Sequence, residues 1–277
     1  MIENLFFELT KLSPSLKKNL WQWWYELLAK NYQKSDWEFM NYGFADLQGE
    51  LSSLNLSQED ENNRYFIQLY QYVSSALPLA EKTVLEVGSG RGGGAHFLAK
   101  TYHPQEMIGV DLSMKNITLA NQLYQRPNLA YRQGDSENLP FEDNYFDLII
   151  NVESSHCYPA MAKFMEEVKR VLRIGGVFSW VDLRPLQEVE SLEECFNNCG
   201  LKKIKFSNIT ANVVRALELV NEGKEEAINN NVPWFLRQAF REFAGVKDGK
   251  IYDGFVQGEM VYLSAIFIKE KNSELFN

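Results

Sequence analysis

The sequence predicts an α/β protein with a mostly parallel sheet that is covered by helices on both faces. From residue 83 onward, short apolar runs of strand length alternate with segments of helical periodicity, a pattern that is typical of parallel sheets. The first run, residues 83–87, leads into a glycine-rich turn and then into a helix that includes residues 95–100. This order predicts a site for a nucleotide-like ligand, because the free N–H groups of the helix point back at the turn.

The size and composition of the chain indicate how it is organised. Its 277 residues, of which 45% are hydrophobic and 23% charged, are enough for one α/β domain with an elaboration. We therefore expect a single compact unit, with an N-terminal helical cap or lid over residues 1–80 and a ligand-binding domain over 81–277. A helical insert is expected at about 209–258, because this connection between the last two strands is far longer than a plain crossover needs.

Composition also disfavours several classes of function. The formal charge of −9 argues against a nucleic-acid partner, which would need a basic face. The apolar runs are too short for a transmembrane segment, and the N-terminus lacks the features of a signal peptide. Three cysteines without a C-x-x-C pair favour a reducing, cytoplasmic setting. Three histidines without zinc-site spacing argue against a bound metal.

Two aromatic segments precede the first strand. Apolar and aromatic side chains recur at helical spacing over about 16–28, so we expect a helix that packs on the core, closes as a lid, forms a dimer face or contacts a membrane. The stretch Trp37–Phe44 is dense in aromatic rings, whose faces attract cationic ligands. Either Trp37 and Tyr42 wall a ligand pocket, or the stretch seals the end of the sheet. A further helix is expected over 63–77.

The glycine turn carries the first candidate binding residues. Gly88, Gly90 and Gly92 let the backbone turn tightly and approach a ligand that a Cβ atom would push away. Gly88, Gly90 and Gly93 also fit the spacing of a dinucleotide fingerprint, which is weak by itself. Glu86 lies on the strand two residues before Gly88. It distinguishes the two ligand classes, because a carboxylate there repels a pyrophosphate but suits an ammonium group.

The second predicted strand, residues 107–111, ends on an acidic residue. Asp111 follows Glu86 by 25 residues, at a place where a carboxylate accepts both hydroxyls of a ribose. The alternative is that Asp111 caps the helix expected over 113–124, although Ser113 is the better cap. Further strands are expected at 129–133, 148–152, 177–181 (entered from a Gly175-Gly176 turn), 201–207 and 260–268, with a helix over 188–199.

Two residues suited to acid–base chemistry follow neighbouring strands. His156 comes after the strand over 148–152, and Asp182 comes at the end of the strand over 177–181. Adjacent parallel strands lie about 4.8 Å apart, so the carboxylate can hydrogen-bond the imidazole, fix its tautomer and raise its basicity. The alternatives are a capping or solvated role for His156 and a turn or cap role for Asp182.

Three segments together resemble class I S-adenosylmethionine (AdoMet) dependent methyltransferases. They are Glu86-x-Gly88-x-Gly90-x-Gly92, Gly134-Asp-Ser-Glu-Asn-Leu-Pro-Phe141 and Arg170-Val-Leu-Arg-Ile-Gly-Gly176. The resemblance implies a Rossmann-like fold with a seven-stranded sheet of order 3-2-1-4-5-7-6, whose strand seven is antiparallel. It also implies AdoMet as the cofactor.

The resemblance further implies which residues surround the cofactor. In that family, the Asp of the second segment accepts from the adenine amino group and the next backbone N–H meets the ring. These roles map onto Asp135 and Ser136, for which a plain Asx turn is the alternative. The remaining residues that we expect to line the cofactor site are Ser89, Leu112, Glu137, Asn151 and Glu153.

The segments over 39–44, 152–159 and 208–213 narrow the resemblance. They are similar to the phthiotriolone and phenolphthiotriolone dimycocerosates methyltransferase-like group, near the natural-product sugar and polyketide O-methyltransferases. In related sugar enzymes, a His after strand four and an Asp after strand five form the catalytic base, which maps onto His156 and Asp182.

The implied function is methyl transfer to a hydroxyl of a small hydrophobic metabolite, whether polyketide, lipid-like or glycosylated, by an enzyme that could be a homodimer. One alternative is C-methylation of the sterol type, in which His156 is not needed as a base. Another is a cyclase-like protein that uses the bound cofactor non-catalytically. Glu86 and the segment over 134–141 disfavour an NAD-dependent dehydrogenase.

Overall fold

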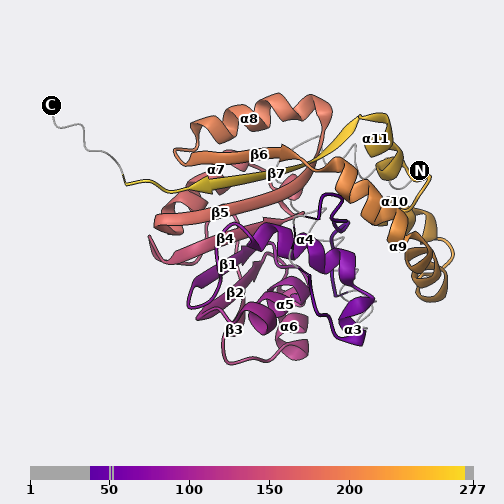
Figure 1. Ribbon diagram of the computed structural model, residues 1–277, viewed down its shortest axis with the longest axis horizontal. Coiled ribbons are helices and arrows are strands. Elements are labelled where there is room, and N and C mark those ends of the chain that lie inside the picture. The colour runs from indigo at the N-terminus through magenta and orange to yellow at the C-terminus, as the bar shows by residue number, and fades with distance from the viewer. Residues whose placement is uncertain (1–37, 50, 52, 272–277) are drawn as a thin grey trace.

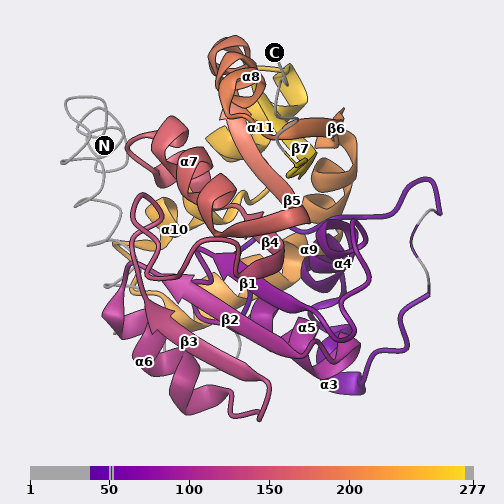
Figure 2. The same ribbon diagram turned by 90° about the vertical axis from the view of Figure 1, so that its left-hand side faces the viewer.

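The structure is a computed structural model of the chain, and it describes residues 38–49, 51 and 53–271. A twisted sheet forms its centre, with helices on both faces (Figures 1 and 2). The aromatic helix expected over about 16–28 and the predicted pocket residue Trp37 lie outside the described residues.

The sheet has seven strands in the order β3-β2-β1-β4-β5-β7-β6, which confirms the order that the family resemblance implies. Neighbouring strands are parallel from β3 to β5, and β7 runs antiparallel to both β5 and β6. The strands are β1 (Thr83–Val87), β2 (Glu106–Asp111), β3 (Leu129–Gln133), β4 (Phe146–Val152), β5 (Leu172–Pro185), β6 (Lys202–Asn208) and β7 (Met260–Ile268).

The largest difference from the predicted strands is in β5, which begins at Leu172 rather than at residue 177. The predicted glycine turn lies inside this strand. Gly175 N–H donates to the Lys269 carbonyl (2.7 Å), and the Gly176 carbonyl accepts from Lys269 N–H (3.0 Å). Antiparallel pairing with β7 also continues as far as Pro185. Strand β5 is therefore longer than its apolar run, because its length is set by its partner.

Helices cover the sheet in two layers. α7 (Met161–Val171) and α8 (Val189–Asn198) bury their apolar faces on one side. The other side is covered by α4 (Arg64–Ser74), α5 (Gly93–Tyr102), α6 (Met114–Leu123), α9 (Thr210–Asn231) and α11 (Lys250–Gln257). The shorter elements are α3 (Gln58–Glu61), η2 (Ser155–Cys157), η3 (Leu186–Glu188) and α10 (Arg237–Ala244). None of the helices in the described ranges is long and apolar enough to cross a membrane.

The segment between β6 and β7 forms the expected helical insert, made of α9, α10 and α11 (Figure 1). α10 begins at Arg237, so Phe235 lies before the helix and is exposed. Ile228, Val232, Ala239, Phe240 and Val246 form a small core inside the insert. Met40 and Cys157 pack against this core, so the insert contacts both the aromatic loop and the segment after β4.

Candidate active site

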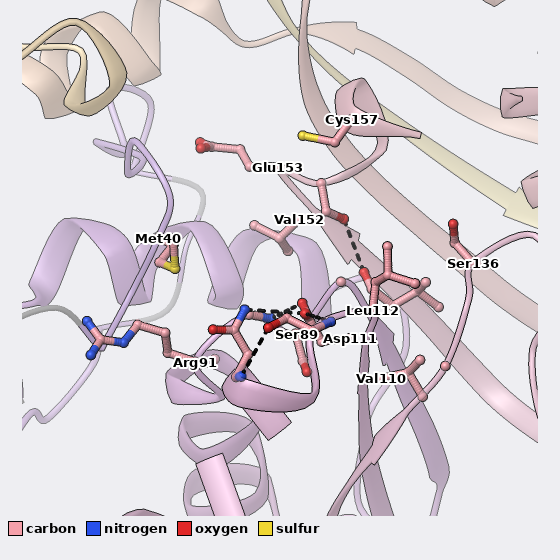
Figure 3. A pocket seen from close by; sticks show the side chains of 18 of the residues that line it. Met40, Ser89, Arg91, Val110, Asp111, Leu112, Ser136, Val152, Glu153 and Cys157 are labelled. Atoms are coloured by element: carbon pink, nitrogen blue, oxygen red, sulfur yellow. Dashed lines mark hydrogen bonds between the residues drawn. The ribbon is translucent and has the colours of Figure 1, made fainter. Parts of the chain in front are cut away.

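A cavity lies beyond the carboxyl ends of β1 to β4, where α/β sheets bind their ligands. Its wall contains Gly88, Ser89, Gly90, Asp111, Leu112, Asp135, Ser136 and Glu153 from the predicted set. Figure 3 shows Glu153 and Cys157 on the opposite side of this cavity from Ser89 and Asp111. The wall also includes Met40, Tyr70 and Ser154, which the sequence analysis did not single out.

The glycine turn after β1 supplies the floor of the cavity. Its three predicted glycines all have positive φ angles (Gly88 +78°, Gly90 +52°, Gly92 +90°), which L side chains rarely adopt. A Cβ atom on Gly88 would lie 2.3 Å from Ser154 Oγ, whereas one on Gly90 would meet only Met40 Sδ, at 3.7 Å. Gly88 therefore permits close packing, and Gly90 leaves open space for a ligand.

Asp111 ties this turn to α6. Its Oδ2 accepts from Gly90 N–H (2.9 Å), and its Oδ1 accepts from Ser113 N–H (2.8 Å) and from Asn116 Nδ2 (3.3 Å). The Ser113 side chain caps the helix by accepting from Asn116 N–H, as the sequence predicts. Burial raises the pKa of Asp111 to about 6. A ligand that donates hydroxyls or carries positive charge would favour its ionised form.

Glu86 lies outside the cavity wall, although Tyr70, to which it is bound, lies in the wall. Glu86 is completely buried, and its Oε1 accepts from Tyr70 O–H (2.7 Å). Its Oε2 has no hydrogen-bond partner within the described part of the chain. Burial raises the pKa of Glu86 to about 7. Burial disfavours the ionised form of Glu86, and a nearby cation would stabilise that form.

The segment after β3 makes both the wall and a turn. Asp135 Oδ1 accepts from Glu137 N–H (3.1 Å), and the Asp135 carbonyl accepts from Asn138 N–H (3.0 Å). The Asx turn considered for Asp135 is therefore present, and it places Asp135 and Ser136 in the cavity wall at the same time. Glu137 lies outside the wall, where its Oε1 accepts from Ala160 N–H (2.7 Å).

Three other predicted cofactor residues support the wall without being part of it. Asn151 Nδ2 donates to the Val87 carbonyl (2.9 Å) and to Ser154 Oγ (2.8 Å), which joins the ends of β1 and β4. Gly92 packs so tightly that a Cβ atom would lie 2.8 Å from Ala120 Cβ. Tyr42 acts through its backbone N–H, which donates to Glu153 Oε1 (2.7 Å).

Glu153 joins the aromatic loop to the sheet. It directly follows β4 with a φ angle of +45°, which is uncommon for a residue with a side chain. Its Oε1 accepts from Tyr42 N–H and from Tyr262 O–H, both at 2.7 Å. The Tyr42 hydroxyl in turn donates to the Phe243 carbonyl in the insert (3.2 Å). Burial raises the pKa of Glu153 to about 7.

The structure brings His156 and Asp182 into direct contact, as the neighbouring strand ends predict. His156 Nδ1 lies 2.7 Å from Asp182 Oδ1, and His156 N–H donates to Asp182 Oδ2 (2.8 Å). An ionised carboxylate only accepts hydrogen bonds, so Nδ1 carries the proton, and in the neutral imidazole Nε2 holds the lone pair. The wall of the cavity includes the adjacent Cys157 but not His156, whose side chain is 22% exposed.

The two partners have opposite electrostatics. Burial by itself would raise the pKa of Asp182, but His156 and Arg184 outweigh burial and hold that pKa well below its usual range. Burial by itself would lower the pKa of His156, but its neighbours Cys157 and Asp182 outweigh burial and raise that pKa. The pair is therefore held as a carboxylate beside an imidazole of increased basicity.

Sequence reasoning missed the groups that surround this pair. Ser155 donates to Asp182 Oδ2 (2.6 Å), and Arg184 Nη1 lies 3.0 Å from the same oxygen. Strand periodicity could have suggested Arg184, because residues two apart in β5 point to the same face. Outside the dyad, Tyr70 and Tyr262 were also missed, since nothing in the local sequence pairs them with Glu86 and Glu153.

Among the residues that the structure describes, no group of three or more His, Cys, Asp or Glu side chains is arranged to hold a metal ion. The cavity does fit a cofactor with an adenosine part. Ser89 Oγ is buried without a hydrogen-bond partner in the described chain and belongs to the wall. Ser89 directly precedes Gly90, where an added Cβ atom would meet only Met40 Sδ, at 3.7 Å.

The family model and two curated relatives that match this chain are all methyltransferases. Residues 85–180 match the model of a methyltransferase domain. The phthiotriol/phenolphthiotriol dimycocerosates methyltransferase of Mycobacterium tuberculosis H37Rv is 36% identical, over 93% of this chain and 95% of the relative. The fatty-acid O-methyltransferase of Mycolicibacterium smegmatis is 34% identical, over 88% of each chain.

Solved structures share the fold at lower identity. The SpnF cyclase superposes with a TM-score of 0.68 at 15% identity, over 93% of this chain and 96% of that chain. The geranyl diphosphate C-methyltransferase of Streptomyces coelicolor, crystallised with S-adenosyl-L-homocysteine, superposes with a TM-score of 0.63 at 15% identity, over 88% of this chain and 97% of that chain.

Proposed function

Because this chain belongs to the AdoMet-dependent methyltransferase family of its phthiotriol and fatty-acid relatives, we propose that it methylates a hydroxyl group of a small hydrophobic acceptor. The observation that carries this proposal is the His156–Asp182 pair, with 2.7 Å between Nδ1 and Oδ1. A hydroxyl is a poor nucleophile and benefits from a base placed beside it. The names of the relatives support an acceptor that is a lipid.

Different residues of the cavity would hold different parts of the cofactor. When bound, the cofactor supplies an electrophilic methyl group on a sulfonium. Asp111 would accept the ribose hydroxyls, and Asp135 with the backbone of Ser136 would hold the adenine. The glycine turn would receive the amino-acid end, whose positive charge Glu86 would stabilise. Such contacts would position the methyl group, and positioning supplies most of the catalysis when the cofactor is already activated.

His156 takes the proton of the acceptor hydroxyl at Nε2. Asp182 keeps Nδ1 protonated, so Nε2 is the basic atom of the neutral ring. The raised pKa of His156 means that a large part of the imidazole is protonated near neutral pH in the enzyme alone. Positive charge bound in the cavity lowers that pKa. We therefore expect activity to rise toward alkaline pH, as the free base becomes available.

The first experiment tests the cofactor. S-adenosylhomocysteine at 100 times its dissociation constant stabilises the protein by about 2.7 kcal/mol, so differential scanning fluorimetry should show a clear rise in Tm, with none for NAD. Absence of a shift with S-adenosylhomocysteine would contradict the assignment.

The second experiment tests the acceptor chemistry. A long-chain alcohol and the fatty acid of the same length are offered with AdoMet, and the products are identified by mass spectrometry. We expect a methyl ether from the alcohol and a loss of roughly 10²–10⁴ in rate for His156→Ala, with unchanged S-adenosylhomocysteine affinity. Methyl ester alone, or unchanged turnover in the variant, would exclude a His156-assisted hydroxyl reaction and favour carboxyl or carbon methylation.

A further inference from the structure

We propose that Arg184 is a positioning residue for the His156–Asp182 pair. Arg184 fixes the orientation of the Asp182 carboxylate. Its positive charge also neutralises part of the negative charge of Asp182, so the carboxylate stabilises the second proton of the imidazole, at Nε2, less strongly. The inference rests on the proposed role of His156 as a base. Arg184 would act through Asp182 and Ser155, and it lies outside the cavity wall.

The contacts of Arg184 form a closed, buried network. Arg184 Nη1 lies 3.0 Å from Asp182 Oδ2, and Nη2 donates to Ser155 Oγ (2.8 Å). Ser155 Oγ donates to the same Asp182 oxygen (2.6 Å) and accepts from Trp180 Nε1 (2.8 Å). Arg184 also lies over the Trp180 ring, at 5.4 Å from its centre, and donates to the Leu183 carbonyl. Each group has a fixed partner, so the carboxylate cannot rotate without breaking several hydrogen bonds.

The geometry assigns each oxygen of Asp182 to a different task. Oδ1 faces the imidazole, where it accepts from His156 Nδ1 and from Leu183 N–H (2.8 Å). Oδ2 accepts from Ser155 and from His156 N–H, and it faces Arg184. The imidazole contact is therefore made by the oxygen that the guanidinium leaves free.

Charge balance gives Arg184 its effect on the base. Asp182 and Arg184 have exposed fractions of 0% and 5%, so water screens their charges weakly. With a neutral imidazole, the two charges cancel. A second proton on His156 would place two cations beside one carboxylate, which the buried guanidinium disfavours. Arg184 thus offsets part of the stabilisation that Asp182 gives to imidazolium.

Other ionisable groups that face this pair come from several elements. They are Glu153, Cys157 and Tyr158 in the segment after β4, Tyr42 in the aromatic loop and Tyr262 in β7. Lys224 of α9 faces Glu153. Besides His156, Arg184 is the one cation in an ion pair with Asp182 among the described residues, so its removal should move the titration of His156.

The test compares two substitutions of Arg184. Arg184→Gln removes the charge but keeps a donor for Ser155, and Arg184→Lys keeps the charge but loses the planar fork. The titration of His156 is followed by NMR on the full chain, with the signal assigned by its loss in His156→Asn, and the pH profile of kcat/KM is recorded in parallel. Arg173→Gln is the matched control, because Arg173 is also in β5 but pairs with Asp147 (2.9 Å) away from the site.

We expect Arg184→Gln to move the His156 midpoint upward by about one pH unit, a tenfold change in proton affinity, and to move the acidic limb of the profile with it. Arg184→Lys should restore the midpoint but not the full kcat, and Arg173→Gln should change neither. An unchanged midpoint in Arg184→Gln, or an equal shift in Arg184→Lys, would overturn the inference.

The same data separate this inference from the proposed function. If His156→Asn keeps full turnover while Arg184→Gln still shifts the His156 midpoint, then His156 is not the base and the coupling to Arg184 stands. If Arg184→Gln does not fold, the inference depends on Arg184→Lys, in which a shifted midpoint would overturn it and a retained midpoint with reduced kcat would support it.

Discussion

The two sides of the cavity are built by contacts of different range along the chain. On the side of the glycine turn, which we call the cofactor side after the proposed function, Asp111 accepts a hydrogen bond from the N–H of Gly90, 21 residues earlier. On the side of the His156–Asp182 pair, which we call the acceptor side after the proposed function, Glu153 accepts from Tyr42 N–H and Tyr262 O–H, at separations of 111 and 109 residues. The Tyr42 hydroxyl donates to the Phe243 carbonyl across 201 residues. The cofactor side is thus formed by contacts within a strand–turn–helix segment and its neighbouring strand, and the acceptor side is assembled from segments that are distant in the sequence.

This difference predicts that the two sides fail in different ways. Changes on the cofactor side should weaken binding of AdoMet and leave the chemical step unaltered once the cofactor is saturating. Changes on the acceptor side should slow methyl transfer or loosen the fold while the cofactor still binds. The four predictions below test this separation.

The largest effect is expected from Asp182→Asn on the acceptor side. The amide cannot hold the His156 proton by charge, so the rate should fall by roughly 10²–10⁴. The variant also leaves Arg184 buried without its carboxylate, so the free energy of unfolding should fall by about 3–5 kcal/mol. Calorimetric affinity for S-adenosylhomocysteine should stay close to that of the wild type.

Asp147→Asn is the control for this variant. Asp147 pairs with the partly exposed Arg173 (2.9 Å), and exposed pairs contribute about 0–1 kcal/mol. The control should keep its rate. A matching loss of cofactor affinity in Asp182→Asn would break the proposed separation of the two sides.

A large effect is also expected from Gly88→Ala on the cofactor side. The added Cβ atom would lie 2.3 Å from Ser154 Oγ, and the φ angle of +78° is unfavourable for alanine. Gly175→Ala has almost the same φ angle (+79°) but no atom within 4 Å of the added Cβ, so it isolates the backbone cost of about 1–2 kcal/mol. Gly88→Ala should lose more stability than this control and also lose cofactor binding. Equal unfolding free energies for Gly88→Ala and Gly175→Ala would show that the Ser154 side chain moves away from the added Cβ atom without loss of stability.

A moderate effect is expected from Asp111→Asn. Hydrogen bonds to a charged group contribute about 1.5–3 kcal/mol, which corresponds to roughly 10–100-fold in the Kd of AdoMet. The value of kcat at saturating AdoMet should remain near that of the wild type, because the acceptor side is intact. Titration calorimetry and steady-state kinetics measure the two quantities, and a large fall in kcat would argue against a purely binding role.

The smallest effect is expected from the titration of Glu86, which should change stability and ligand affinity with pH. Burial raises its pKa from the ordinary 4.5 to about 7. The folded state therefore holds the proton more tightly than the unfolded state, and this contribution to stability is lost as pH rises from 4.5 through 7. A cationic ligand favours the ionised form of Glu86. The affinity of the protein for such a ligand should therefore rise a few-fold between pH 4.5 and 7, and binding should release protons.

Calorimetry near pH 6.5 in buffers of different ionisation heat measures this proton release. Glu86→Gln should reduce this proton release, and part of the remainder should come from Asp111, whose pKa burial raises to about 6. Proton release that is the same in Glu86→Gln and the wild type would assign the effect to another group.

Most of the cofactor side could be predicted from the sequence. The glycines of the turn, Asp111 and Asp135 lie next to strand ends, and their positions depend on local backbone geometry. Ser113 could be identified as the helix cap for the same reason. The strand bounds also followed from apolar runs, except in β5, where pairing with β7 added residues beyond the run.

The side chains of the acceptor side could be predicted only in part. His156 and Asp182 were paired because neighbouring parallel strands bring their ends together. The Arg184–Ser155–Trp180 network was not foreseen, because hydrogen-bond partners of a buried carboxylate depend on packing between layers. Glu86 shows the same limit, since its sequence position indicated a pocket carboxylate and the fold placed it behind the wall, bound to Tyr70.

The sequence by itself determined the family, because short motifs carry the resemblance to it, and the sheet order and the cofactor class followed from that resemblance. Only the tertiary structure decided which groups surround His156 and how the loop at Tyr42 meets Glu153 and the insert. The physical reason is that a buried charge must be satisfied by whatever donors the packed layers bring within reach. Those donors come from residues that are far apart in the chain.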